Sequence, residues 1–130
     1  MTVRCLLDTH TFLWWIVDDP RLSARASALI RDPSNEIWFS AASAWEIAIK
    51  AQLGRITFED DLVEFIPRQV AVNGFRNLPI QSDHALHVSR LALLHRDPFD
   101  RMLAAQALVE KMVLLTADQT LSRYGVQVIW

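Results

Sequence analysis

Glycine and cysteine are both scarce in this 130-residue chain, which has three glycines and one cysteine. Three glycines cannot supply a glycine-rich phosphate-binding loop, so a nucleotide-binding fold of that kind is disfavoured. The single cysteine, Cys5, has no partner for an intrachain disulfide, and no cluster of cysteine and histidine supports a zinc site. No apolar run reaches the roughly 18 residues that a membrane span needs. We therefore expect a cytoplasmic protein with no membrane partner.

The chain also lacks a linker rich in proline, glycine or serine, a low-complexity tract and an internal repeat. With 52% hydrophobic residues it can bury one core, so we predict a single domain over residues 1–130. The net charge of −2 does not point to nucleic acid. If the five acids of the candidate site described below are set aside, the 15 acidic residues become 10, against 13 basic ones. Eleven of the basic residues are arginines, which suit phosphate contacts.

Short apolar or β-rich segments alternate with helical patterns along the chain. The expected strands are residues 3–7, 36–40, 75–80, 112–116 and 126–130, and the expected helices are 12–17, 21–31, 42–53, 61–72, 82–94, 98–111 and about 120–124. Pro79 favours an edge position for segment 75–80. This alternation predicts an α/β fold, a three-layer α/β/α sandwich around a mostly parallel sheet of about five strands.

Two of the apolar strands run directly into an aspartate, Asp8 in the first case and Asp118 in the second. Ligands of open α/β sheets bind beyond the carboxyl ends of the strands, so both carboxylates are expected at the edge where chemistry takes place. Neighbouring parallel strands would bring them together. The alternative is that each aspartate only caps the helix that follows it.

Glu46 lies in the helix that follows the second expected strand, so it is expected near the same edge. Its alternative role is an ion pair with Lys50, four residues further on. Asp97 precedes Pro98, which is a cap-and-first-turn signature, and Asp100 then falls in the first turn of a mostly apolar helix. Asp97 is the stronger candidate for a pure helix cap.

Several carboxylates at one site raise each other's pKa values unless a cation neutralises them. Oxygen-only ligands suit Mg²⁺, with Mn²⁺ as the alternative, and such a site points to phosphate chemistry. The histidines are scattered, and His84 and His87 are expected on a solvated helix face; the full set is His10, His84, His87 and His95. An Asp-x-Asp phosphatase is disfavoured because His10 stands where its second carboxylate is needed. The strand-end lysine of a phosphoacceptor receiver is absent.

Four segments together resemble the PIN-domain ribonucleases, and in particular the VapC-type toxins of bacterial toxin–antitoxin pairs. These segments are residues 6–10, 43–47, 97–107 and 115–118. The resemblance covers essentially the whole chain, with the acids in the family's order and spacing. It implies a parallel sheet in strand order 3-2-1-4-5 with helices on both faces, and a metal-dependent endonuclease that cleaves RNA to a 5′-phosphate and a 3′-hydroxyl.

The resemblance identifies four residues with the family's Mg²⁺-binding acids, namely Asp8, Glu46, Asp100 and Asp118. Asp97 corresponds to an additional acid that many relatives carry. We hypothesise that Asp8 and Asp100 ligate the ion directly and that Glu46 and Asp118 complete the shell through waters or a second ion. Asp118 is the first of the four we would remove from the set. Supporting contacts to ligands or phosphate are assigned to Thr9, Thr116 and Arg101, each with an ordinary structural role as the alternative.

The segment Phe12–Val17 has no polar face, so one side of this first helix needs a cover. The second helix is one candidate, and a partner is the other. The resemblance implies two partners besides the RNA substrate: a second copy of the chain in a homodimer and a cognate antitoxin. The remaining alternative for the whole protein is a catalytically inactive PIN-like interaction module whose acids are structural caps.

Overall fold

The computed structural model describes residues 2–94 and 97–130. Its strands are β1 (Arg4–Leu7), β2 (Glu36–Ser40), β3 (Arg76–Leu78), β4 (Val113–Leu115) and β5 (Val128–Ile129). They form one sheet in the order β3-β2-β1-β4-β5, and each of its neighbouring pairs is parallel. The predicted strand order is confirmed, and the edge position of the segment before Pro79 is confirmed as well.

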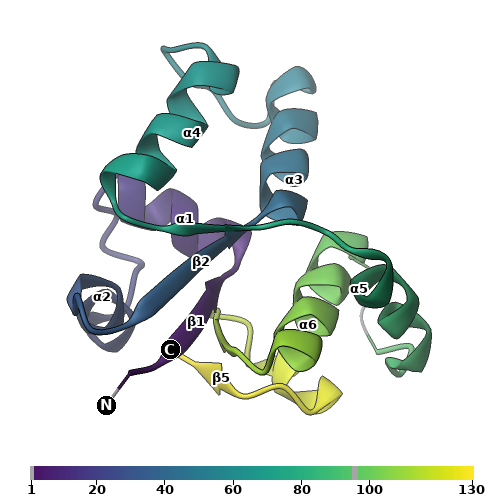
Figure 1. Ribbon diagram of the computed structural model, residues 1–130. Coiled ribbons are helices and arrows are strands. Elements are labelled where there is room, and N and C mark those ends of the chain that lie inside the picture. The colour runs from purple at the N-terminus through teal and green to yellow at the C-terminus, as the bar shows by residue number, and fades with distance from the viewer. Residues whose placement is uncertain (1, 95–96) are drawn as a thin grey trace.

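The α-helices of the described residues are α1 (Thr9–Ile16), α2 (Ala24–Arg31), α3 (Ala41–Gln52), α4 (Leu62–Val72), α5 (Ser82–His87) and α6 (Pro98–Glu110), with 3-10 helices η1 (Val88–Arg90) and η2 (Gln119–Tyr124). They cover both faces of the sheet, with α2 and α6 on opposite sides of the strands (Figure 1). None of these helices is both long enough and apolar enough to cross a membrane.

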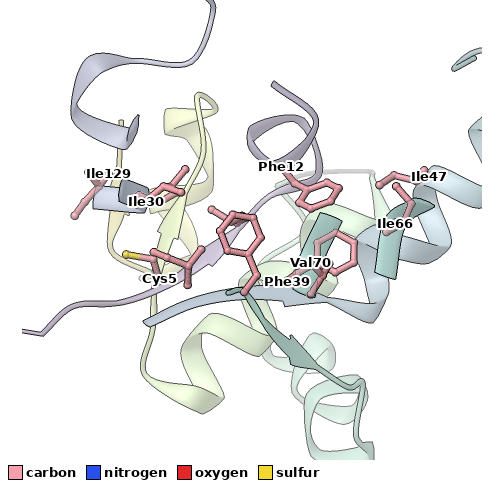
Figure 2. Packing of buried hydrophobic residues seen from close by; sticks show 12 residues of the cluster. Cys5, Phe12, Ile30, Phe39, Ile47, Ile66, Val70 and Ile129 are labelled. Carbon is pink, nitrogen blue, oxygen red and sulfur yellow. The ribbon is translucent and has the colours of Figure 1, made fainter. Parts of the chain in front are cut away.

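Side-chain alternation along the strands divides the core in two, because successive residues of a strand point to opposite faces. Cys5 and Leu7 of β1 pack on one face, where Phe12 of α1 and Ile66 of α4 join them (Figure 2). Leu6 points to the other face, which α6 covers. β1 and β4 are therefore buried on both sides, which explains why they read as nearly continuous apolar runs rather than as alternating ones.

Polar residues set the first residue of most helices. Asp8 and Ser23 cap α1 and α2, Ser40 caps α3, and Asp61 and Asp97 cap α4 and α6, each accepting a hydrogen bond from a backbone N–H of the first turn. Such a cap satisfies an amide that has no partner inside the helix. The caps explain two differences from the predicted bounds: α1 begins at Thr9 and α2 begins at Ala24.

The predicted helix over residues 82–94 is wrong in its second half. α5 ends at His87, η1 follows, and Leu91 has an extended backbone with φ −78° and ψ 138°. Leu91 is buried against Ala104 and Ala105 of α6, and this packing competes with continuation of the helix. The predicted solvated face is also wrong for His84, whose side chain is fully buried between α5 and α6. His95 lies outside the described residues.

The tryptophan-rich first helix is covered largely by its own chain. Phe12 is fully buried, and the indole N–H of Trp15 donates to Asn73 at the end of α4 over 2.9 Å. The guanidinium groups of Arg21 and Arg31 lie over the rings of Trp14 and Trp15. Of the two candidate covers, the second helix is thus present in part, since Arg31 ends α2, and α4 adds to it, while Val17 stays 66% exposed.

Candidate functional site

Asp8 stands at the carboxyl end of β1, at the centre of the sheet. Its side chain is buried, and its backbone N–H donates to the carbonyl of Leu115 in β4 over 3.1 Å. Oδ1 accepts from the N–H of Thr11 over 2.8 Å, which is the N-cap of α1. Asp8 can therefore cap α1 and bind a ligand at the same time, because capping occupies Oδ1 and leaves Oδ2 for the ligand.

Glu46 lies on α3 and is also buried, with both carboxylate oxygens hydrogen-bonded. The hydroxyl of Thr9 lies 2.6 Å from Oε1, and Nζ of Lys50 lies 2.5 Å from Oε2. The Thr9 hydroxyl is 3.0 Å from that of Ser43. Since a hydroxyl has one proton, Thr9 donates to the carboxylate and accepts from Ser43. Thr9, directly after Asp8 in the chain, thus links α1 to Glu46, and the ion pair with Lys50, which was the alternative role of Glu46, is present.

Asp97 and Asp100 belong to the first turn of α6, and the position of that helix places them at the same edge. A side-chain N–H of Arg4, at the start of β1, donates to the carbonyl of Glu110 over 2.6 Å, so the last turn of α6 lies at the opposite, amino edge. Thirteen helical residues span roughly 20 Å. The first turn of α6 is therefore at the carboxyl edge, where Phe99 contacts Trp45 of α3 at 5.2 Å between ring centroids.

Asp97 is a confirmed helix cap, with Oδ1 accepting from the N–H groups of Phe99 and Asp100 over 2.8 and 3.4 Å. Asp118 is likewise a cap, of η2, and accepts from the N–H of Thr120 over 3.0 Å. The N–H of Asp118 in turn donates to the buried hydroxyl of Thr116 over 3.0 Å.

The predicted acids therefore share one edge of the sheet, but they are not drawn together as a tight cluster. Within the described residues, one trio of acidic or histidine side chains has its ligand atoms all within 4.8 Å of one another, and it consists of Asp83, His84 and Glu110. The four acids of the carboxyl edge do not form such a group. Mg²⁺ keeps several waters and takes only one or two carboxylates directly. The four acids at the carboxyl edge offer only carboxylate oxygens and lie further apart than the members of the trio. Such a set of donors fits a hard ion that keeps its waters.

The trio of Asp83, His84 and Glu110, at the amino edge of the sheet, is poorly suited to binding a metal ion. Nδ1 of His84 accepts from the N–H of Gln81 over 3.0 Å, so the proton of the neutral ring sits on Nε2. Nε2 then donates to Glu110 over 2.8 Å and has no free lone pair for an ion. This pair joins α5 to α6 and is structural. Its two members lie 26 residues apart in the chain, and no local sequence signal marks them.

Arg101 has a structural role, one of the two that its sequence context allowed. Its guanidinium donates to the carbonyl of Ala92 over 2.8 Å and to that of Val88 over 3.3 Å, and it lies 5.8 Å from the centroid of the Tyr124 ring. These bonds join η1 and Ala92 to α6. They occupy both terminal nitrogens, so a phosphate contact by Arg101 would have to compete with them.

Comparison with known proteins agrees with this architecture. The family model for the PIN domain matches residues 5–127. Ribonuclease VapC22 of Mycobacterium tuberculosis (strain ATCC 25618 / H37Rv) is 31% identical over 117 residues, covering 89% of this chain and 88% of the relative. Ribonuclease VapC16 of the same organism is 36% identical over 72 residues, or 52% of this chain, and this match spans about half (51%) of that relative's length.

Among solved structures, VapBC2 from Rickettsia felis, bound to a DNA fragment from its promoter, contains a chain with a TM-score of 0.73 and 14% identity. The similarity covers 98% of this chain and 99% of that one. At this identity the likeness shows the fold, and it confirms the predicted sheet with its 3-2-1-4-5 order.

Proposed function

The chain belongs to the PIN domain family, and on that premise we propose that it is a metal-dependent endoribonuclease, the toxin of a toxin–antitoxin pair. Two relatives are named ribonucleases of the VapC type, and one of them aligns along most of the chain. The observation that carries the proposal is the pair of buried carboxylates, Asp8 and Glu46, joined through Thr9 at the carboxyl edge of the sheet. Buried carboxylates are costly and are kept where they bind a cation or a partner.

The residues that would hold Mg²⁺ or Mn²⁺ are Asp8 and Asp100, with Glu46 and Asp118 completing the shell. A bound ion of this kind supplies an activated water and neutralises charge on the phosphoryl group. The chain's own contribution is to hold the carboxylates in place. The N–H of Thr11 fixes Asp8, the hydroxyl of Thr9 orients Glu46, and the cap formed by Asp97 fixes the turn that carries Asp100.

The partners that we propose are RNA as substrate, a cognate antitoxin and a second copy of the chain. The relatives' names support the RNA, and VapBC2 supports the antitoxin. Several large apolar side chains remain exposed on the described surface, among them Trp45 at 61% and Leu93 at 94%. Exposed apolar groups of this size are common at protein–protein interfaces, so the surface can accommodate protein partners. We place the reaction in the cytoplasm.

Asp8→Asn tests the catalytic assignment. Asparagine caps helices as well as aspartate does, so α1 should form and the thermal midpoint should change little. We expect Mg²⁺-dependent cleavage of RNA to fall by at least about 100-fold, because a ligand to the ion is lost. Asp61→Asn is the matched control, since Asp61 caps α4 and carries no candidate ligand. Full residual activity in Asp8→Asn would remove the proposed mechanism.

One specific observation favours the alternative of an inactive PIN-like interaction module: Asp8, Asp97 and Asp118 each cap a helix. A module of this kind would gain no stability from Mn²⁺ or Mg²⁺, whereas a metal-binding nuclease gains stability in proportion to occupancy. A thermal melt with and without each ion, repeated with Asp8→Asn, separates the two. A shift in the wild type that Asp8→Asn loses supports the nuclease.

A further inference from the structure

A hollow of about 540 Å³ lies between α1 and the segment that joins α3 to α4. His10 and Trp14 of α1 form one wall, Arg55 and Phe58 form the other, and Lys50 closes the end toward α3. Its volume is in the range of sites that hold small organic ligands or parts of larger ones. This hollow is separate from the oxygens of the four acids, yet it begins beside one of them.

The hollow is continuous with the carboxyl edge. Thr9 and Lys50 both line it, and these are the two side chains that hydrogen-bond the carboxylate of Glu46. Only the side chains of Thr9 and Lys50 therefore lie between a group bound in the hollow and the Glu46 carboxylate of the candidate active site. A polymer cleaved at the acids would have to place a neighbouring unit close to this point.

The charge of the hollow is opposite in sign to that of the chain. Lys50, Arg55 and Arg21 line it, against one acid, Asp19, while the whole chain has a net charge of −2. Arg21 is neutralised by Asp19 at 2.8 Å and Lys50 by Glu46. Arg55 is exposed, and within the described part of the chain it has no ion-pair partner. A phosphate is the kind of group that such an arginine binds.

Aromatic rings accompany the cations. The exposed His10 lies 5.7 Å from Trp14, whose ring is also covered by the Arg21 guanidinium at 5.1 Å, and Phe58 contacts Phe65 on the other wall at 5.6 Å. Aromatic side chains next to cationic ones are the combination by which proteins bind single-stranded nucleic acid, since bases stack on rings while cations meet phosphates. Leu13, Ile16, Val17 and Ile56 also line the hollow, and apolar side chains of this kind can contact the face of a base as well as a protein segment. The exposed Arg55 and the position of the hollow beside Glu46 favour RNA as its occupant.

We propose that this hollow is a subsite for a nucleotide adjacent to the scissile phosphate of single-stranded RNA. Arg55 contacts a backbone phosphate there, and His10 and Phe58 contact the base. This inference rests on the proposed function, because it assigns the subsite to the RNA that the acids would cleave. It adds residues outside the acidic set and gives them a part in substrate selection.

The test measures binding of a fluorescein-labelled, mixed-sequence single-stranded RNA 12-mer by anisotropy, in EDTA so that no cleavage occurs. We expect Arg55→Ala to weaken binding about 10-fold and to lower the slope of log affinity against log salt by about 0.7, the value for one phosphate contact on a single strand. Arg68→Ala is the matched control, because Arg68 is an exposed arginine of α4 outside the hollow. It should leave both quantities unchanged.

A second measurement uses the same 12-mer with one abasic ribose at each position in turn. For the wild type, removing the base at one position of the RNA should weaken binding. For His10→Ala and Phe58→Leu, removing the same base should weaken binding less. With Mg²⁺ present, Arg55→Ala should raise KM and leave kcat unchanged. This split separates a binding residue from a merely structural one.

Equal affinity and salt slope for Arg55→Ala and the wild type would overturn the subsite while leaving the proposed function intact, provided that the wild type cleaves RNA. The subsite would also be overturned if Arg55→Ala cleaved RNA normally but no longer co-purified with the antitoxin. That result would assign the hollow to the antitoxin. If the wild type neither binds nor cleaves RNA, the proposed function fails and the subsite fails with it.

Discussion

Lys50 holds its ammonium nitrogen 2.5 Å from Oε2 of Glu46, a carboxylate whose side chain is only 3% exposed. With the Thr9 hydroxyl on the other oxygen, Glu46 is neutralised and fully hydrogen-bonded by its own chain. The lysine therefore supplies, without any ion, the positive charge that a buried acid needs. A metal bound at this edge would share Glu46 with Lys50 or take its place.

The first prediction concerns Lys50→Met, which keeps the length of the side chain and removes the charge. We expect the free energy of unfolding to fall by about 1–3 kcal/mol, less than for a fully buried pair because Lys50 is partly exposed. Urea denaturation at neutral pH measures the loss. Adding Glu46→Gln should recover part of it, since the uncompensated charge is then gone. A double variant less stable than Lys50→Met would contradict this account.

The second prediction separates the two groups of acids. Glu46→Gln should reduce the thermal shift produced by Mn²⁺, whereas Glu110→Gln should leave that shift unchanged, because His84 has no free nitrogen to offer beside Glu110. Each glutamate is replaced by the same isosteric amide, so the two variants control each other. The measurement is a melting curve across a series of Mn²⁺ concentrations. A shift that depends on Glu110 would move the metal site to the amino edge of the sheet.

The third prediction concerns Cys5, where burial raises the pKa of the thiol from 9.0 to about 11. In the native protein we expect no reaction with a thiol reagent at pH 8, and full reaction in urea. The raised pKa also makes stability depend on pH. Below pH 9 the thiol is protonated in both states and has no effect, and between pH 9 and about 11 only the unfolded chain loses the proton, so stability falls.

Urea midpoints at pH 8.5 and 10.5 measure that fall. Cys5→Ala should be less stable at pH 8.5 because it leaves a small cavity, but its midpoint should drop less between the two pH values. Equal drops in the two proteins would show that other groups account for the pH dependence.

The fourth prediction concerns Lys111, which ends α6 in the left-handed conformation with φ 57° and ψ 49°. A side chain is unfavourable there, and glycine is the residue most often found at this point after a helix. Lys111→Gly should raise the free energy of unfolding by about 0.5–1 kcal/mol. Lys111→Ala keeps the Cβ and removes the charge, so it is the control. Stabilisation by alanine equal to that by glycine would assign the effect to charge.

The sequence predicted the sheet well because the signals involved are local. Mostly apolar strands, such as the one before Asp8, indicate burial on both faces, and polar residues at helix starts, such as Ser40, are the caps that the structure contains. The assignment of Asp8, Glu46, Asp100 and Asp118 as metal ligands stays a prediction. The structure adds that they share an edge and that Glu46 is already paired.

What the sequence by itself determined is therefore most of the elements and the edge at which the acids lie, since these follow from hydrophobic periodicity and capping within a few residues. The order of the strands in the sheet came from the resemblance to the PIN-domain ribonucleases. Only the tertiary structure decided that His84 is buried against Glu110, that Arg101 holds carbonyls rather than standing free, and that the helix after Ser82 stops early. Those outcomes depend on contacts between segments far apart in the chain, where packing and paired hydrogen bonds outweigh local preference.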